Sequence, residues 1–191
     1  MLFRKDVPKE ISAVKLSKWY NGLDDRNKNR LSRYIEGADV SSRADFLRDV
    51  ISKAYADENY AAAILIGEAA ESMDLTKKEL FFISEEYILA LYAGKNYGEA
   101  KRLCCRNLEF IPELYSDIVV DGVIPERMPC RNRLIDIMVL AEKDYDGADR
   151  MLERYCEMGI LSEEDLFYRR QSLKIHRLQR TFDGIFTGNT P

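Results

Sequence analysis

One short pattern recurs along the chain: an aromatic residue at a turn, followed at once by small residues that begin a helix. It occurs at Tyr60, Tyr97 and Tyr145, and in a looser form at Phe182. Tyr97 follows Tyr60 by 37 residues, Phe182 follows Tyr145 by 37, and the middle interval is 48. A fixed period of this length is typical of stacked helical hairpins. The pattern therefore predicts an all-α fold of stacked antiparallel helical hairpins.

Helical periodicity on both sides of each tyrosine supports this prediction. Three residues after the tyrosines stand Ala63, Ala100 and Ala148, and the positions that share their helix face are mostly small or apolar. These positions are Ile66, Gly67, Ala70, Leu103, Cys104, Asn107, Met151, Leu152 and Tyr155. Upstream of each tyrosine, a second apolar stripe predicts the first helix of the hairpin. The three stripes are Leu47, Val50, Ile51 and Ala54; Leu80, Ile83, Tyr87 and Leu91; and Leu134, Met138 and Ala141.

Start and stop signals divide the chain into units. Ser42 and Thr76, each followed three residues later by an acid, predict helix N-caps, while Pro112 and the region of Gly159 predict the ends of second helices. We expect a single helical-repeat domain over 1–191. Its segments are an N-terminal helical pair that caps the stack (10–39), three repeats (42–75, 76–114 and 129–160), an insertion (115–128) and a partial C-terminal repeat (162–191).

The insertion accounts for the longer middle interval and lacks helical periodicity. Its Ile118, Val119, Val120, Val123 and Ile124 are too apolar for a free loop. We expect this segment to fold back over the stack or to contact a partner.

Composition limits the classes of function. With 46% hydrophobic and 32% charged residues, the chain can bury a core, and 5 Pro and 10 Gly are few for an all-β protein. A net charge of −4 gives no support for a nucleic-acid partner, which we regard as unlikely. The start of the chain lacks the apolar core of a secretory signal, and no segment is long and apolar enough to span a bilayer. We therefore expect a cytoplasmic protein without a membrane partner.

The repeat resembles that of the tetratricopeptide repeat family, which has a tyrosine near the turn, an alanine three residues later and a closing proline. Tyr97, Ala100 and Pro112 match these positions, and the corresponding residues of the other units match in part: Tyr60, Ala63 and Ala70, then Tyr145 and Ala148. The period of 37 exceeds the family's 34, and the family's Trp and Gly in the first helix are missing. The resemblance covers residues 42–186. It implies a right-handed α-α superhelix whose first helices line a concave groove for a peptide or a partner helix.

The family's groove positions can be carried over to this chain one by one. They fall on Arg48, Ser52, Tyr55, Glu85, Leu89, Tyr92, Arg133, Ile137, Arg170, Lys174 and Arg177. Tyr55 and Tyr92 are 37 residues apart, and Tyr and Arg are the residues that most often anchor interfaces. Both tyrosines could equally pack between helices. The Lys and Asn positions with which some family members hold a C-terminal carboxylate are not reproduced, so that ligand is not predicted.

A basic segment, 168–180, carries five Arg or Lys residues and no acid. It could meet an acidic partner or an RNA backbone. The acids at 163–165 followed by bases are, however, also what complements a helix dipole.

Residues for chemistry are sparse. His176 is the only histidine, and no acid or nucleophile stands near it in the sequence. The cysteines, Cys104, Cys105, Cys130 and Cys156, match no metal-ligand spacing and are expected to be buried free thiols. We expect no catalytic residue, metal or cofactor. The sequence therefore favours a non-catalytic protein-interaction module that binds a peptide or helix, with an RNA-associated repeat and an enzyme on a helical scaffold as the alternatives. A homodimer is also possible because an incomplete terminal repeat leaves apolar surface.

Overall fold

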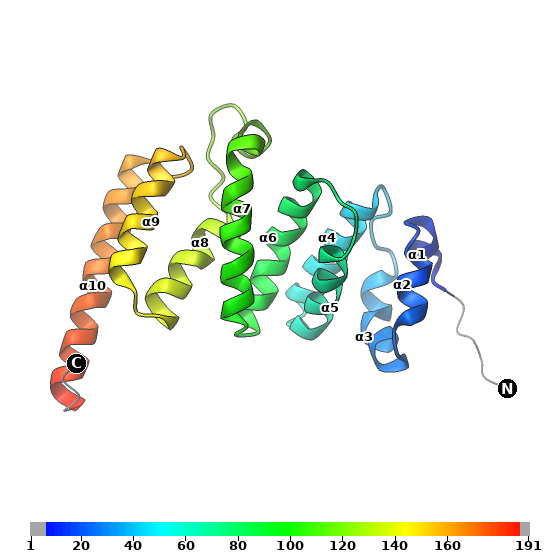
Figure 1. The fold of residues 1–191 in the computed structure, drawn as a ribbon. Coiled ribbons are helices and arrows are strands. Elements are labelled where there is room, and N and C mark those ends of the chain that lie inside the picture. Colours follow the sequence, from blue (N-terminus) through cyan, green and yellow to red (C-terminus); the bar gives the residue numbers. More distant parts are fainter. Residues whose placement is uncertain (1–6, 188–191) are drawn as a thin grey trace. The chain divides into compact units, whose positions relative to one another are not determined.

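The fold is all-α, as the repeat predicts (Figure 1). The computed structural model describes residues 7–187, with side chains through residue 182. Within that range the only β structure is an isolated bridge between Val120 and Val123. The chain divides into two compact units: the first unit ends at Leu103 and the second unit begins at Cys104.

The first unit opens with three short helices, where the sequence predicts two. They are α1 (Lys9–Ala13), α2 (Ser17–Gly22) and α3 (Asp25–Ile35). Lys15, with a φ of +60°, breaks the expected first helix into α1 and α2. Asp24 caps α3 by accepting a hydrogen bond from the Asn27 N–H at 2.7 Å.

Two successive hairpins follow, built from α4 (Arg43–Ala56), α5 (Tyr60–Glu71), α6 (Lys77–Ala93) and α7 (Tyr97–Ile118). In the first unit, α4 packs on α5 and α6, and α5 packs on α6. Both predicted N-caps are confirmed. Ser42 accepts from the Asp45 N–H at 3.0 Å, and Thr76 forms a reciprocal capping box with Glu79.

The turns before Tyr60 and Tyr97 share one backbone geometry. Glu58 and Lys95 have φ values of +57° and +62°, in the left-handed region that usually favours glycine. The next residue, an asparagine in both turns, donates its N–H to the carbonyl five residues earlier, at 2.9 and 2.8 Å. Each aromatic residue thus starts its helix directly after a closed helix end.

The helix α7 continues to Ile118, so the predicted end at Pro112 is wrong. Proline removes one backbone hydrogen bond from a helix interior. Beyond it, Leu114 and Ile118 continue the buried stripe of α7, and their burial favours extending the helix.

Residues 115–118 of the expected insertion belong to the last turn of α7, so its predicted start is wrong, and the part that follows contains a tight turn. Asp121 and Gly122 both have positive φ values, 53° and 74°, and the Val123 N–H donates to the Val120 carbonyl at 2.9 Å. Two successive residues of this kind form the turn that matches the twist of a β-hairpin. Val119 is buried, as expected for a segment that folds back, while Val120 and Val123 are exposed at the tip.

The second unit continues with α8 (Pro129–Asp136), the π-helical segment η1 (Ile137–Ala141), α9 (Tyr145–Glu157) and α10 (Glu163–Thr187). The π turn adds a residue and rotates the following side chains. Leu134 and Met138 are buried as predicted, but Ala141 is exposed, so its assignment to the buried stripe is wrong. Gly159, with a φ of +69°, follows the end of α9 as predicted.

The predicted turn at Phe182 is wrong, because α10 runs through it without a break. The turns before Tyr60, Tyr97 and Tyr145 each have an Asn or Asp directly before the tyrosine. At the fourth copy this position is Thr181, whose hydroxyl donates to the Arg177 carbonyl at 3.0 Å within the helix. Because no residue at this position caps a further helix, α10 continues. The last predicted residues, 188–191, lie outside the described part of the chain.

Candidate partner-binding surfaces

Two tyrosine pairs stand at equivalent places in the first unit. Tyr55, near the end of α4, packs on Tyr60, with ring centroids 6.0 Å apart and planes tilted by 42°. Tyr92, near the end of α6, packs on Tyr97 in the same way, at 5.4 Å and 57°. All four rings are half-buried. We call these residues the tyrosine pairs.

The tyrosine pairs combine the two roles that the sequence leaves open for Tyr55 and Tyr92. Each side chain is held against a second ring across the helical turn, so packing fixes part of its orientation. Each is also only partly buried and therefore keeps some surface for a partner. Tyr60 and Tyr97 thus each begin a helix, and the ring of each supports a neighbouring tyrosine.

The other predicted groove residues of the first unit differ in access. Arg48 is exposed and lies 3.4 Å from the Asp45 carboxylate, and Ser52 is half-buried. Glu85 and Leu89 are only 8% and 7% exposed. The cause is the position of α6, which packs against both α4 and α5 and buries most of its length. Glu85 and Leu89 therefore offer little surface to a partner.

Two predicted residues of the second unit lie on α8 and η1. Arg133 is half-buried and donates to Asp136, one turn later, at 2.6 Å. Ile137 is 1% exposed and belongs to the core. The prediction that Ile137 lines a binding surface is therefore wrong, because the π segment turns three consecutive residues inward.

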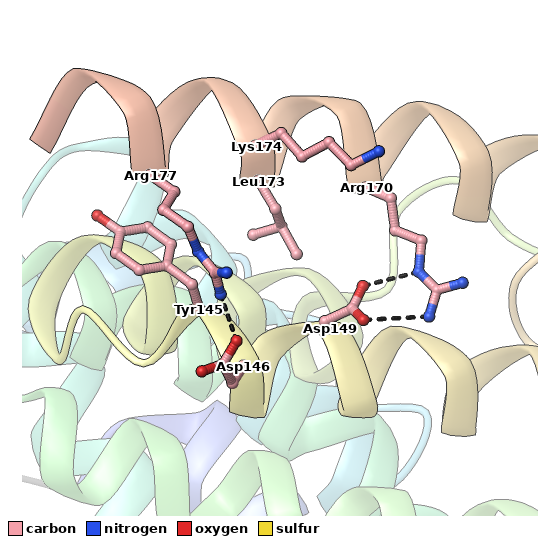
Figure 2. Close-up of a pocket in the computed structure, with 7 residues that line it drawn as sticks. All are labelled: Tyr145, Asp146, Asp149, Arg170, Leu173, Lys174 and Arg177. Atoms are coloured by element: carbon pink, nitrogen blue, oxygen red, sulfur yellow. Dashed lines mark hydrogen bonds and ion pairs between the residues drawn. The ribbon is translucent and has the colours of Figure 1, made fainter. Parts of the chain in front are cut away.

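The remaining three predicted residues, Arg170, Lys174 and Arg177, come together beside a groove between α9 and α10 (Figure 2). The groove has a volume of about 350 Å³. Figure 2 shows Leu173 pointing from α10 into the space between the two arginines. The other residues that line the groove are Tyr145, Asp146 and Asp149 of α9.

Ion pairs across this groove hold α10 against α9. Arg170 donates two hydrogen bonds to the Asp149 carboxylate, at 2.7 and 3.1 Å, and also forms an ion pair with Glu153. These carboxylates raise the pKa of Arg170 further above its usual value, so the guanidinium stays charged. Arg177 pairs with Asp146, and its guanidinium lies 5.8 Å from the centroid of the Tyr145 ring.

The basic segment is therefore partly neutralised within the second unit, because two of its five bases, Arg170 and Arg177, pair with acids. Two of its three cations on this side of α10 already pair with acids of α9. Within the described part of the chain, no carboxylate pairs with Lys174. Hydrogen bonds and ion pairs between α9 and α10 are thus the main use of these arginines, and a phosphate backbone would have to compete with them.

The residues considered for chemistry differ in their access to solvent. His176 is exposed on α10, Cys104 and Cys130 are buried, and Cys105 is exposed, which corrects its expected burial. The Cys156 thiol donates weakly to the Leu161 carbonyl at 3.3 Å, and burial raises its pKa, which keeps it protonated. In residues 7–182, no three potential ligands among His, Cys, Asp and Glu are grouped to hold a metal ion.

Arg131 is a residue that sequence reasoning misses. It is 4% exposed and donates to three backbone carbonyls: Ile160 at 2.5 Å, Pro125 at 3.1 Å and Glu126 at 2.9 Å. Burial lowers the pKa of this guanidinium. The hydrogen bonds of Arg131 link the insertion to the turn between α9 and α10, and no local sequence pattern predicts this role. For the turn of the insertion a signal existed, since Asp121-Gly122 between valines is a strong hairpin indicator.

Over the described range, no helix combines the length and the apolar character that crossing a bilayer requires. Comparison with known proteins adds no identity: no family model matches the chain, and neither a curated protein nor a solved structure matches it.

Proposed function

We propose that this chain is a non-catalytic protein-interaction module, a divergent relative of the tetratricopeptide repeats, and that its first unit binds an extended peptide or a partner helix over the tyrosine pairs. One observation carries the proposal. Two partly buried tyrosines, Tyr55 and Tyr92, stand 37 residues apart near the ends of α4 and α6 in one compact unit, each supported by a second ring.

Tyrosines of this kind suit recognition for two physical reasons. A tyrosine ring offers a large, amphipathic contact area with few rotatable bonds, so little side-chain entropy is lost when it binds. Packing against Tyr60 or Tyr97 removes part of that freedom before binding, which lowers the cost of association. The exposed Arg48, about two helical turns before Tyr55 on α4, adds a charge that can orient a partner.

The RNA and enzyme alternatives receive less support. Arg170 and Arg177 already pair with carboxylates of α9, which weakens the basic surface that RNA would need. The pKa of Cys156 is raised rather than lowered, which is the opposite of an activated nucleophile.

Photo-crosslinking from the tyrosine positions tests the proposal. Benzophenone amino acids replace Tyr55 or Tyr92 in the full chain, and Glu68, which is exposed on α5, serves as the control position. We expect the same protein to be captured from native lysate at positions 55 and 92, not at 68, with no effect of RNase.

Substitution supplies the second arm. Tyr55→Ala with Tyr92→Ala should weaken binding of the captured partner at least about thirtyfold, as expected for the loss of hot-spot tyrosines. Tyr55→Phe with Tyr92→Phe keeps the ring contacts and should bind far better. If the double alanine variant keeps its helical content and still binds every partner, the proposal is wrong. Capture that RNase abolishes would favour the RNA alternative instead.

A further inference from the structure

The last helix, α10, has large apolar residues on two sides, and only Leu173 is buried inside the second unit. Leu173 is 8% exposed and lies on the side that packs against α9, together with Arg170 and Arg177. Five large hydrophobic residues of the same helix are instead 55–60% exposed. They are Phe167, Tyr168, Ile175, Leu178 and Phe182.

These five residues form one stripe, which we call the α10 stripe. At about 100° per residue they fall within a sector about 100° wide, on the side of α10 turned away from α9. Tyr168, Ile175 and Phe182 are seven residues apart, and Leu178 lies seven after Gln171, between them. This interleaved spacing by three and four is that of the a and d positions of a coiled coil. The α10 stripe therefore fits another helix laid along it.

The charges of α10 indicate how a second copy of the same helix would lie. Its first turn carries Glu163, Glu164 and Asp165, while Lys174, near its middle, and Arg180, in its second half, have no paired carboxylate among the described side chains. Parallel pairing would set acids beside acids and bases beside bases. Antiparallel pairing centred near Ile175 instead separates the two acidic first turns, because each then lies beside residues 185–187 of the other copy, and it also opposes the two helix dipoles.

The area is sufficient for such a pair. The five side chains of the α10 stripe offer roughly 500 Å² per copy, or about 1,000 Å² for two copies before their neighbours are counted. Specific interfaces begin at about that size. The helix α10 is also continuous over 25 residues, about 37 Å, so the whole stripe is presented on one element.

We infer that the chain forms a homodimer through antiparallel packing of the α10 stripes of two copies. The seam is formed by Tyr168, Ile175, Leu178 and Phe182, with Gln171 as its one polar position. The two-fold axis lies near Ile175, the middle of the stripe, so Phe167 and Tyr168 of one copy meet Phe182 of the other. This inference does not depend on the partner proposed for the tyrosine pairs, which belong to the other unit.

Molar mass in solution tests the dimer, with two neighbouring substitutions that add the same charge. Ile175→Glu places a carboxylate in the seam, while His176→Glu places it on the next residue, outside the stripe and exposed. At ~100 μM full-length chain, light scattering should give twice the 22.2 kDa of one chain for wild type and for His176→Glu. Ile175→Glu should give a monomer with unchanged helical content.

Two results would overturn the inference. One is a wild-type chain that stays at 22.2 kDa at this concentration, which would leave the α10 stripe to a different protein. The other is an Ile175→Glu chain that remains dimeric, which would place the dimer contact elsewhere.

Orientation needs its own measurement. A benzophenone amino acid in place of Phe182 should crosslink to the peptide that contains Phe167 and Tyr168 of the other copy. Crosslinks confined to the other copy's residues around 182 would mean parallel pairing and would contradict the antiparallel arrangement.

Discussion

The two units join neighbouring helices by different means. In the first unit, α5 meets α6 through Gly67, whose backbone lies so close to the Tyr87 ring that an added Cβ would stand 2.4 Å from its carbons. In the second unit, α10 meets α9 largely through arginine–carboxylate pairs (Figure 2). The first contact is apolar and closed to water, and the second is polar and lies at the surface.

This difference predicts different responses to the solvent. Close packing keeps Tyr87 at 2% exposure, and this burial raises the pKa of its hydroxyl. The ion pairs of α10 are a third to three quarters exposed, and exposed pairs are weak and screened by salt. The stability of the first unit should therefore depend on close packing, whereas the attachment of α10 to α9 should depend on ionic strength. A helix held on one side by exposed pairs also keeps its opposite side available for a second copy.

Gly67→Ala should give the largest effect on stability. The new methyl group would overlap the Tyr87 ring, and both elements are fixed by buried neighbours, so we expect a loss of about 3 kcal/mol in the free energy of unfolding. Urea denaturation of the full chain, followed by circular dichroism, measures this loss.

The matched control is Gly98→Ala, also in a helix but with nothing within 4 Å of the added Cβ. It should stabilise the chain by about 0.5 kcal/mol, because alanine has the higher helix propensity. Equal effects of the two substitutions would show that close approach to Tyr87 does not govern the α5–α6 contact.

Arg131→Ala should have the next largest effect, because it tests whether the second unit also depends on buried groups. The Ile160 and Pro125 carbonyls lose their side-chain donor, the Glu126 carbonyl keeps only the Asn132 amide, and a cavity forms. We expect a loss of about 2 kcal/mol by the same denaturation measurement. Arg133→Ala, two residues along α8 and a third exposed, should cost less than about 0.5 kcal/mol. If Arg133→Ala costs as much as Arg131→Ala, burial is not what distinguishes them.

Sequence reasoning succeeds where the deciding interactions are local. The caps at Ser42 and Thr76 and the starts of helices at Tyr60, Tyr97 and Tyr145 follow from residues within one turn of each other. The turn at Phe182 fails for the same reason: the aromatic residue is present but the Asn or Asp before it is not. The end at Pro112 fails because residues beyond it, such as Ile118, find a buried place that the local sequence does not reveal.

The candidate surfaces are less predictable, because exposure depends on which helices pack together. Spacing places Tyr55 and Tyr92 at equivalent positions, which the tyrosine pairs bear out. By the same spacing, Leu89 occupies the position in its repeat that Ser52 occupies in the previous one. Leu89 is nevertheless buried, because α6 packs against helices on two sides. For Arg170 and Arg177, the partners Asp149 and Asp146 lie 21 and 31 residues away, at a register that only the folded hairpin sets.

A smaller, local effect is expected when the ion pairs of α10 are removed. In Arg170→Gln with Arg177→Gln, backbone amides of residues 166–182 should exchange with solvent several-fold faster, because α10 is held less firmly against α9. High salt should produce the same change in the wild-type chain and no change in the amides of α5. Hydrogen exchange with mass spectrometry measures both. If the amide exchange rates of α10 change neither with salt nor with the two substitutions, Leu173 alone holds the helix against α9.

The smallest expected effect comes from an exposed polar contact placed in the first unit, at the capping box of α6. The Thr76 backbone N–H and hydroxyl both donate to the Glu79 carboxylate and lower its pKa below the ordinary 4.5. Because the folded state favours the ionised carboxylate, its contribution is present above pH 4.5 and is lost as the pH falls toward the lower folded-state pKa. Glu79→Gln should therefore lower the free energy of unfolding at pH 7 by about 0.5 kcal/mol, after allowance for solvent screening, and by almost nothing at pH 3. Glu68→Gln, on an exposed position of α5, controls for the loss of one charge, and urea titrations at both pH values measure the difference. If Glu79→Gln at pH 7 approached the effect of Gly67→Ala, polar contacts would matter as much as close packing in the first unit, and the distinction between the two units would fail.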